Sequence, residues 1–464
     1  MASETSPTLH ILFFPLMAPS HMLPVHDMAK LFAARSGVNC TFLTTHGNAH
    51  LVKPHPAIKL QLIPFPPDSG LPAGCENQST VPCQDLEPNF FAALSKLRQP
   101  FDVVLRELHP DCVITDAFFP WTYDIAAELD IPRLVFHVSN NFSRCAFDAL
   151  DRHKVFQDLP SEEESFVIPG LPHRIEMLKT YMPDPREMHP VFFELIPQMM
   201  EAEPKSYGVV TNSVYELEPD YVDYSRNVIG RKTWCFGPVS LCNSRGDVGV
   251  ATNPTCLNWL DSMSPRSVVY VSFGSLSHFS KSQLTEIALG LEASDQPFLW
   301  VLREADEEWM IDGYEQRTKG KGLIIRGWAP QVQILNHKAI GGFVTHCGWN
   351  SSLEGICAGL PLVTWPLFAE QFFNERFILD VLKIGVAVGI KEHTIKHVER
   401  PVIEAGKVEK AVRLLMGDGE ETVERWGRVR ELGEMAKKAV EIDGSSYNDM
   451  ESLIKELKES QKTK

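Results

Sequence analysis

Short apolar runs alternate with amphipathic stretches along the first half of the chain. The apolar runs predict buried strands, and apolar residues at every third or fourth position predict helices. The first helical stretch opens at Pro24 and ends near Gly37, both typical helix boundaries. Strands alternating with helices predict a parallel sheet with crossovers. We expect strands at His10–Phe14, Val38–Leu43, Leu60–Leu62, Cys112–Thr115, Leu134–His137, Gly208–Thr211 and Cys235–Pro238, further helices at Asn89–Leu108 and Trp121–Leu129, and loops over Asp151–Pro190.

The same alternation restarts after a segment of linker composition. Leu241–Pro254 is rich in Asn, Ser, Gly and Asp. We therefore expect an α/β protein with units at residues 1–243 and 255–440, joined by a linker at 244–254. The second unit has predicted strands at Val268–Phe273, Phe298–Val301, Leu323–Ile325, Ile340–Val344 and Val386–Gly389, and predicted helices at Ser282–Glu292, Glu370–Leu382 and Lys407–Met416.

The end of the chain has two amphipathic stretches. Thr422–Val440 carries an apolar helical stripe, and Ser446 with Asp449 fits the start of a last helix as a capping pair. We expect the segment 441–464 to pack back toward the first unit.

Composition narrows the class of protein. With 44% hydrophobic and 22% charged residues, the chain is typical of soluble globular proteins. A net charge of -16 without a Lys/Arg block argues against a nucleic-acid partner. No apolar run approaches the roughly 20 residues that span a bilayer, and the run Leu9–Ala18 lacks a preceding Lys or Arg, so it reads as a strand rather than a leader. The ten cysteines show no CxxC or metal-like spacing, which indicates reduced thiols in a cytoplasmic protein.

The stretch Trp328–Gln371 is the first candidate site. An apolar run leads into the turn Thr345–Gly348, and a helix follows from Asn350 or Ser351. Unpaired N–H groups at a helix start favour a phosphate or diphosphate, and His346 lies in the same turn. The turn Phe273–Ser275 follows another strand and is expected at the same sheet edge. A purely structural alternative stays open, because Ser351 and Glu354 also fit a capping box.

His21 and Asp116 form the second candidate site. Each follows or ends a predicted strand, so both are expected at one edge of the first sheet. An imidazole backed by a carboxylate can take a proton from a hydroxyl group. The sequence has no GxGxxG after the first strand, no P-loop and no GxSxG, which argues against a dinucleotide-dependent oxidoreductase. It also has no Asp-x-Asp pair to hold a metal with a sugar diphosphate, so we expect no metal and no resident cofactor.

The stretch Trp328–Gln371 resembles the complete signature box of plant family 1 UDP-dependent glycosyltransferases. It contains WAPQ, HCGWNS, the Glu of SLEG and a closing acidic-Gln pair. The front motif FPLMAPSHMLPVHDMAKLF, TDAFFPW and VSFGS extend the resemblance over nearly the whole chain, with Ser20 where the family has Gly before His21. The resemblance implies a GT-B fold, in which two Rossmann-like domains face each other across a cleft. The N-terminal domain would bind the acceptor and the C-terminal domain the UDP-sugar.

The resemblance also assigns a role to each matching residue. Trp328 would stack on uracil, Ala329 would bond the base through its backbone, and Gln331 and Glu354 would reach the ribose. Ser275, His346, Asn350 and Ser351 would hold the diphosphate, and Trp349, Glu370 and Gln371 would contact the sugar. His21 would be the general base with Asp116 as its partner, and Phe118 and Asn140 would line the acceptor pocket.

These roles imply direct inverting transfer of glucose from UDP-glucose to a hydroxyl of a hydrophobic metabolite, of flavonoid or of triterpenoid and steroid type. Gln371 at the last position of the box favours glucose. The expected partners are therefore a UDP-sugar and a small acceptor, and the expected state is a monomer. The alternatives are a catalytically silent UDP-sugar-binding protein, the same fold with another UDP-sugar, and a two-Rossmann oxidoreductase.

Overall fold

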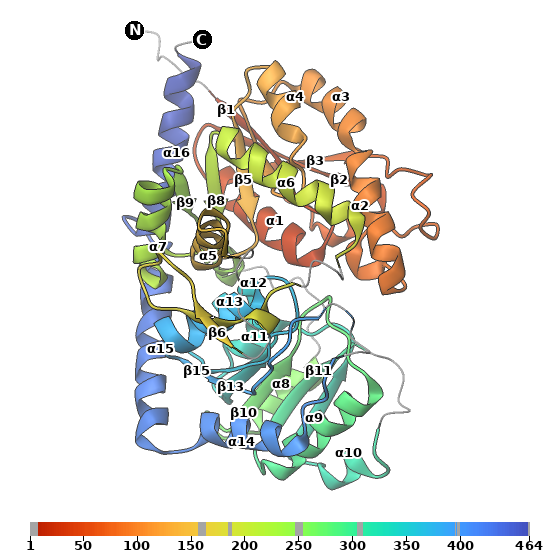
Figure 1. The fold of residues 1–464 in the computed structure, drawn as a ribbon, viewed down its shortest axis with the longest axis vertical. Coiled ribbons are helices and arrows are strands. Elements are labelled where there is room, and N and C mark those ends of the chain that lie inside the picture. The colour runs from red at the N-terminus through yellow and green to blue at the C-terminus, as the bar shows by residue number, and fades with distance from the viewer. Residues whose placement is uncertain are drawn as a thin grey trace.

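The computed structural model describes residues 8–155, 164–183, 188–245, 254–303, 310–394, 396 and 400–462. Two α/β units lie one above the other in Figure 1, the N-terminal unit at the top. Most of the predicted linker falls on 246–253, outside the described residues. No described helix is both long and apolar enough to cross a membrane.

The N-terminal unit is built on one parallel sheet of order β3-β2-β1-β4-β5-β8-β9. Along β1, Ile11 and Phe13 pack with α1 and the last helix, α16 (Ser445–Gln461), on one face, whereas Leu12 and Phe14 pack with α2, α3 and α4 on the other. Burial on both faces explains why the strand is apolar at successive positions. The strands are β1 (Leu9–Phe14), β2 (Val38–Thr45), β3 (Ile58–Ile63), β4 (Cys112–Asp116), β5 (Arg133–His137), β8 (Gly208–Thr211) and β9 (Thr233–Cys235). The helices are α1 (Pro19–Ala33), α2 (Glu87–Ser95), α3 (Arg98–Leu108), α4 (Thr122–Glu128), α5 (Asn141–Arg152), α6 (Pro190–Lys205) and α7 (Pro219–Tyr224).

The C-terminal unit repeats this plan with the sheet order β12-β11-β10-β13-β14-β15. Val269 and Val271 of β10 pack with α9 and α14, and Tyr270 packs on the opposite face with residues of α12. The strands are β10 (Val268–Ser272), β11 (Phe298–Leu302), β12 (Gly322–Arg326), β13 (Ile340–Thr345), β14 (Leu362–Thr364) and β15 (Gly385–Ala387). The helices are α8 (Pro254–Asp261), α9 (Lys281–Ala293), α10 (Tyr314–Arg317), α11 (Gln331–Leu335), α12 (Trp349–Cys357), α13 (Gln371–Arg376) and α14 (Ala405–Met416).

Both sheets reverse their strand order at one point. The reversal lies between β1 and β4 in the N-terminal sheet, and between β10 and β13 in the C-terminal sheet. In open parallel sheets the carboxyl ends of strands at such a reversal diverge and leave room for a ligand. The fold is thus α/β with two Rossmann-like domains, each with one natural ligand position.

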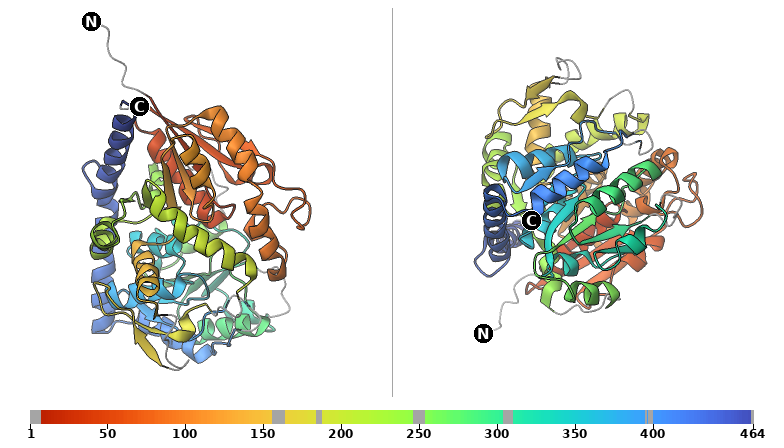
Figure 2. Two further views of the ribbon diagram at one scale, coloured as in Figure 1. Left: turned by 45° about the horizontal axis from the view of Figure 1, so that its top comes forward. Right: turned by 90° about the horizontal axis from the view of Figure 1, so that it is seen from below.

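Two long helices close the chain. Helix α15 (Glu420–Ala439) packs on α12 of the C-terminal unit, and α16 (Ser445–Gln461) packs on β9 of the N-terminal unit. In the left view of Figure 2 the dark-blue α16 lies beside the N-terminal unit. The prediction of Ser446 and Asp449 as a capping pair is wrong. Ser446 donates to the carbonyl of Gly237, and Asp449 accepts from Cys235 N and pairs with Arg226, so both hold the helix against the N-terminal sheet.

Three other local predictions are corrected by the structure. The first helix begins at Pro19, and Pro24 lies inside it, because the chain turns helical after the short turn 15–18 that follows β1. The predicted helix Asn89–Leu108 is two helices, α2 and α3, which meet near Leu97. Within the predicted loops, β6 (Ser165–Val167) and β7 (Glu176–Leu178) form an antiparallel pair, too short for sequence periodicity to reveal.

Candidate active site

One polar pair stands where the N-terminal sheet reverses its order. His21 lies in the first turn of α1, the helix that follows β1 after a short turn, and Asp116 is the last residue of β4. Their Nδ1 and Oδ2 atoms are 2.7 Å apart, and both residues are buried. Asp116 also accepts the backbone N–H groups of Leu16 and Phe118, at 3.1 Å in each case. These bonds fix the carboxylate, which in turn fixes the orientation of the imidazole.

The charge of Asp116 follows from these contacts. Burial by itself would raise its pKa, but the facing His21 and the N–H groups of Leu16 and Phe118 bring the pKa below its ordinary value. Asp116 is therefore ionised near neutral pH and favours the tautomer of His21 with its proton on Nδ1. Nε2 is then left as a proton acceptor, as a general base requires.

Aromatic rings gather beside His21. Phe118 packs edge-on against the imidazole with ring centroids 5.9 Å apart. Phe91 of α2 lies 5.7 Å from Phe118 and 4.8 Å from Phe192 of α6. Sequence patterns give no signal for Phe91 and Phe192, because they lie on separate helices far apart in the chain, and the two internal prolines of α6 obscure that helix.

The turn from β13 into α12 occupies the matching position in the C-terminal sheet. Helix α12 begins at Trp349 after the N-cap residue Gly348, and no side chain caps it. The capping-box interpretation of Ser351 and Glu354 is therefore wrong, since both lie inside the helix. An uncapped helix start leaves its N–H groups to an incoming anion.

His346 packs tightly between two turns. Gly274, with φ of 77°, lies so close that a Cβ there would come within 2.6 Å of the imidazole Cε1. Only glycine fits this left-handed position against the ring. The close approach brings the β10 turn, with Ser275, next to the β13 turn. Burial lowers the pKa of His346 to about 4, so the ring is neutral near pH 7 and can donate a hydrogen bond without a full charge.

A hydrogen-bonded group joins α11 to α12. The Gln331 side chain donates from Nε2 to Ser351 Oγ at 3.1 Å and to Glu354 Oε2 at 2.8 Å, and its Oε1 accepts from the Tyr270 hydroxyl at 3.3 Å. Burial raises the pKa of Glu354 to about 7, against the lowering effect of the bond from Gln331. The structure therefore brings together the two residues predicted to reach the ribose, Gln331 and Glu354.

Trp328 is 66% exposed, whereas the adjacent Ala329 is buried. A tryptophan this exposed gains little from folding, which suits a ring that awaits a stacking partner. The carbonyl of Ala329 accepts the backbone N–H of Gln331 at 2.9 Å, which ties this segment to the start of α11.

The three residues predicted to contact the sugar differ in whether their side chains are already engaged in the structure. Glu370 is half-buried at the N-cap of α13, and burial raises its pKa. Gln371 is buried and uses Oε1 to accept from Leu367 N and Phe368 N at 2.9 and 3.1 Å, which leaves its amide N–H groups for a ligand. The Trp349 indole is 1% exposed and donates to the carbonyl of Asn212 at 2.8 Å. The indole ring is therefore buried at the junction of the two units, and its N–H already has a hydrogen-bond partner there.

The side chain of Asn140 is likewise engaged in hydrogen bonds at the junction of the two units. It is fully buried, its Oδ1 accepts from Ser143 N at 2.8 Å as the N-cap of α5, and its Nδ2 donates to Asn374 Oδ1 at 3.1 Å. Asn374 accepts a second bond from Ser143 Oγ at 2.9 Å and donates to the Cys347 carbonyl at 2.8 Å. These contacts tie α5 to the turn before α12, while Phe118 is the predicted acceptor residue that lies beside His21.

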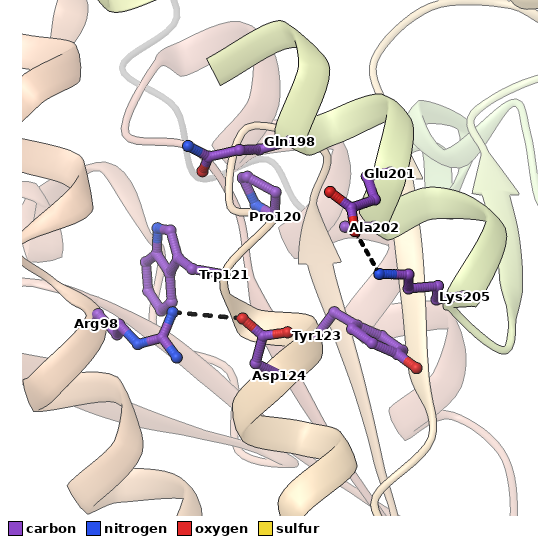
Figure 3. A pocket seen from close by; sticks show the side chains of 9 residues that line it. All are labelled: Arg98, Pro120, Trp121, Tyr123, Asp124, Gln198, Glu201, Ala202 and Lys205. Carbon is purple, nitrogen blue, oxygen red and sulfur yellow. Dashed lines mark hydrogen bonds and ion pairs between the residues drawn. The ribbon is translucent and has the colours of Figure 1, made fainter. Parts of the chain in front are cut away.

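A surface hollow of about 210 Å³ lies elsewhere, among residues of α3, α4 and α6 (Figure 3). Its charged groups pair with one another, Arg98 with Asp124 at 3.5 Å and Lys205 with Glu201 at 2.6 Å. None of the predicted site residues lines it. Among the described residues, no three His, Cys, Asp or Glu side chains gather as a metal site would need.

The fold and the paired edge sites define a two-domain glycosyltransferase. The family model described as UDP-glucoronosyl and UDP-glucosyl transferase matches residues 104–404. The chain is 45% identical to scopoletin glucosyltransferase from Nicotiana tabacum, over 97% of this chain and 98% of the relative. It is also 45% identical to UDP-glucose flavonoid 3-O-glucosyltransferase 7 from Fragaria ananassa, over 98% of both chains.

Solved structures agree with this relationship. A crystal structure from Glycyrrhiza uralensis, complexed with glycyrrhetinic acid 3-O-monoglucuronide, has a TM-score of 0.90 at 41% identity, over 98% of this chain and 97% of that one. A structure from Phytolacca americana, complexed with UDP-2fluoro-glucose and pterostilbene, has a TM-score of 0.80 at 27% identity, over 97% of this chain and 100% of that one. The chain belongs to the plant family of UDP-dependent glycosyltransferases.

Proposed function

We propose that this protein is an inverting O-glucosyltransferase, which moves glucose from UDP-glucose to a hydroxyl of a hydrophobic plant metabolite. One contact carries the proposal. Asn350, in the first turn of α12, donates from Nδ2 to the carbonyl of Ser20 at 2.7 Å, and Ser20 directly precedes His21. The start of the anion-binding helix and the base therefore face each other across the junction of the two units.

The chemistry follows from this placement. His21 Nε2 takes the proton of the acceptor hydroxyl while Asp116 stabilises the imidazolium that forms. The oxygen attacks the anomeric carbon, the bond from that carbon to the diphosphate breaks, and UDP carries the electron pair away. The start of α12 and neutral His346 stabilise the negative charge that develops on the diphosphate. A single displacement inverts the anomeric centre.

We propose the following roles for the donor residues. Trp328 stacks on uracil, Ala329 bonds the base through its backbone, and Gln331 with Glu354 binds the ribose. Ser275, Asn350 and Ser351 hold the diphosphate with His346. Glu370 and the free amide of Gln371 bind hydroxyls of the sugar, and Trp349 serves that end of the site through its backbone.

On the acceptor side we propose an apolar pocket with Phe118, Phe91 and Phe192 as one wall, because these rings adjoin His21. Flat aromatic or polycyclic aglycones suit such a wall. Scopoletin, flavonoids and glycyrrhetinic acid in the names of similar proteins are of this shape, so we propose the same substrate class here. We further propose a cytoplasmic monomer without a metal cofactor, since the ten cysteines of the sequence show no CxxC or metal-like spacing.

The test is an acceptor screen with mass-spectrometric detection. Coumarins, flavonols and triterpenoid aglycones are each incubated with UDP-glucose, UDP-galactose, UDP-glucuronic acid or UDP-rhamnose. We expect a hexoside of at least one aglycone class, with UDP-glucose the fastest donor. Tight UDP-glucose binding without any product across the panel would identify a silent UDP-sugar-binding protein instead.

A further inference from the structure

Pro24 interrupts the hydrogen-bond ladder of the helix that carries the base. It lies inside α1, which runs from Pro19 to Ala33. In an α-helix each carbonyl accepts the N–H of the residue four positions later, and proline has no N–H. The carbonyl of Ser20, four residues before Pro24 and next to His21, therefore has no donor from that position.

Asn350 of the C-terminal unit supplies the donor for this carbonyl. Its Nδ2 lies 2.7 Å from the Ser20 oxygen, and its Oδ1 accepts from Asn212 Nδ2 at 3.0 Å. Asn212 is itself buried and fixed, since its Oδ1 accepts from Val239 N at 3.1 Å. Asn212 thus holds the Asn350 amide with its nitrogen toward Ser20.

We propose that Pro24 is a positioning residue for sugar transfer, because it keeps the Ser20 carbonyl open for Asn350 and so sets His21 against the start of α12. An amide nitrogen carries two hydrogens. One reaches Ser20, and the other is available to a diphosphate oxygen. The leaving group and the base are then held through one side chain, and transfer rates fall steeply when such reacting groups are displaced by about 1 Å.

This inference rests on the proposed function and is tested with Pro24→Ala. The new N–H competes for the Ser20 carbonyl inside α1 and weakens the Asn350 contact. We expect kcat to fall about tenfold, with the KM for UDP-glucose changed less than threefold. The melting temperature should stay equal or rise, because an internal helical proline is removed. A residue with a merely structural role would lose stability together with activity.

Pro19→Ala is the matched control. It also removes a proline from α1, but at the first position, where the helix offers no carbonyl to a new N–H. We expect the parental kcat. An equal loss of kcat in Pro19→Ala and Pro24→Ala, or a parental kcat in Pro24→Ala, would overturn the inference.

A second variant, Asn212→Asp, tests the same contact without changing α1. The carboxylate still accepts from Val239 N but can no longer donate to Asn350. Because it attracts the amide nitrogen of Asn350 instead, the amide should turn, leave its oxygen toward the Ser20 carbonyl, and so lose the bond to Ser20. We expect kcat to fall at least fivefold, and a parental kcat contradicts the bridge. Both variants use the aglycone that the parent glucosylates fastest. If the parent makes no product, the proposed function fails and this inference with it. If the parent transfers glucose and both variants have its kcat, this inference alone fails.

Discussion

The two sheet edges that meet at the candidate active site, the proposed donor side and the proposed acceptor side, are assembled differently. On the donor side, all but one of the predicted contacts fall between Trp328 and Gln371, where one turn and three short helices bring them together. On the acceptor side, His21 and Asp116 are 95 positions apart, and Phe91 and Phe192 come from two further helices. A binding site for a constant ligand can thus reside in one continuous segment. The proposed acceptor wall, in contrast, is spread over elements that can change independently.

The largest expected effect is a loss of kcat on the acceptor side without a loss of UDP affinity on the donor side. His21→Ala should lower kcat about 1000-fold, since general-base catalysis contributes about 100- to 10,000-fold. The affinity for UDP should remain within twofold, because the donor edge is untouched. Initial rates by chromatography and UDP titration by calorimetry measure the two quantities. Transfer at the parental rate would remove His21 as the base.

Trp328→Ala is the converse experiment on the donor side. Stacking of a base on an aromatic ring is worth about 1–3 kcal/mol, so the affinity for UDP should fall roughly tenfold. Trp328→Phe should recover most of it. Because Trp328 is 66% exposed, the melting temperature should hardly change. Unchanged UDP affinity in Trp328→Ala would contradict the stacking role.

The pH dependence of donor binding provides a third comparison. Burial raises the pKa of Glu354 to about 7, so its ionised form, which accepts bonds from ribose hydroxyls, increases as the pH rises through 7. With half of the groups ionised at pH 7 and about one eleventh at pH 6, UDP-glucose affinity should be about fivefold weaker at pH 6. Glu354→Gln should bind weakly at both values and lose this dependence in calorimetric titrations. A dependence that persists in Glu354→Gln belongs to another group.

The same pKa shift has a separate consequence for folding. A carboxyl group whose pKa is raised in the folded state favours folding while protonated. The contribution of Glu354 to the free energy of unfolding therefore falls as the pH rises from about 4.5 to about 7.

The smallest expected effect concerns the acceptor wall. Phe192→Ala should raise the acceptor KM about threefold, by the loss of part of the apolar contact, and leave the UDP-glucose KM unchanged. Phe193→Ala is the control, because Phe193 is 52% exposed on the outer side of the same helix. Equal effects of the two substitutions on acceptor KM would indicate a change in α6 as a whole rather than in the wall.

Local sequence determined much of this protein. Apolar runs predicted most of the strands of both sheets, because residues buried on both faces must be apolar at successive positions. The strand, turn and helix around His346 predicted an anion site, since an uncapped helix start is a property of a few neighbouring residues. The complete motif from Trp328 to Gln371 indicated the family, which the comparisons confirm.

Tertiary structure alone decided the rest. Ser351 with Glu354, and Ser446 with Asp449, fit capping patterns in the sequence, yet partners outside their own helices hold them: Gln331 of α11 binds the first pair, and the N-terminal sheet holds the second. Pro24 fits a helix start in the sequence pattern, but in the structure it lies inside α1 and leaves the carbonyl of Ser20 without a donor from its own position. Asn350, 330 positions after Ser20, binds that carbonyl. Local patterns indicate which backbone groups a segment leaves without a hydrogen-bond partner. Which group then bonds to them depends on how separate elements of the chain pack together.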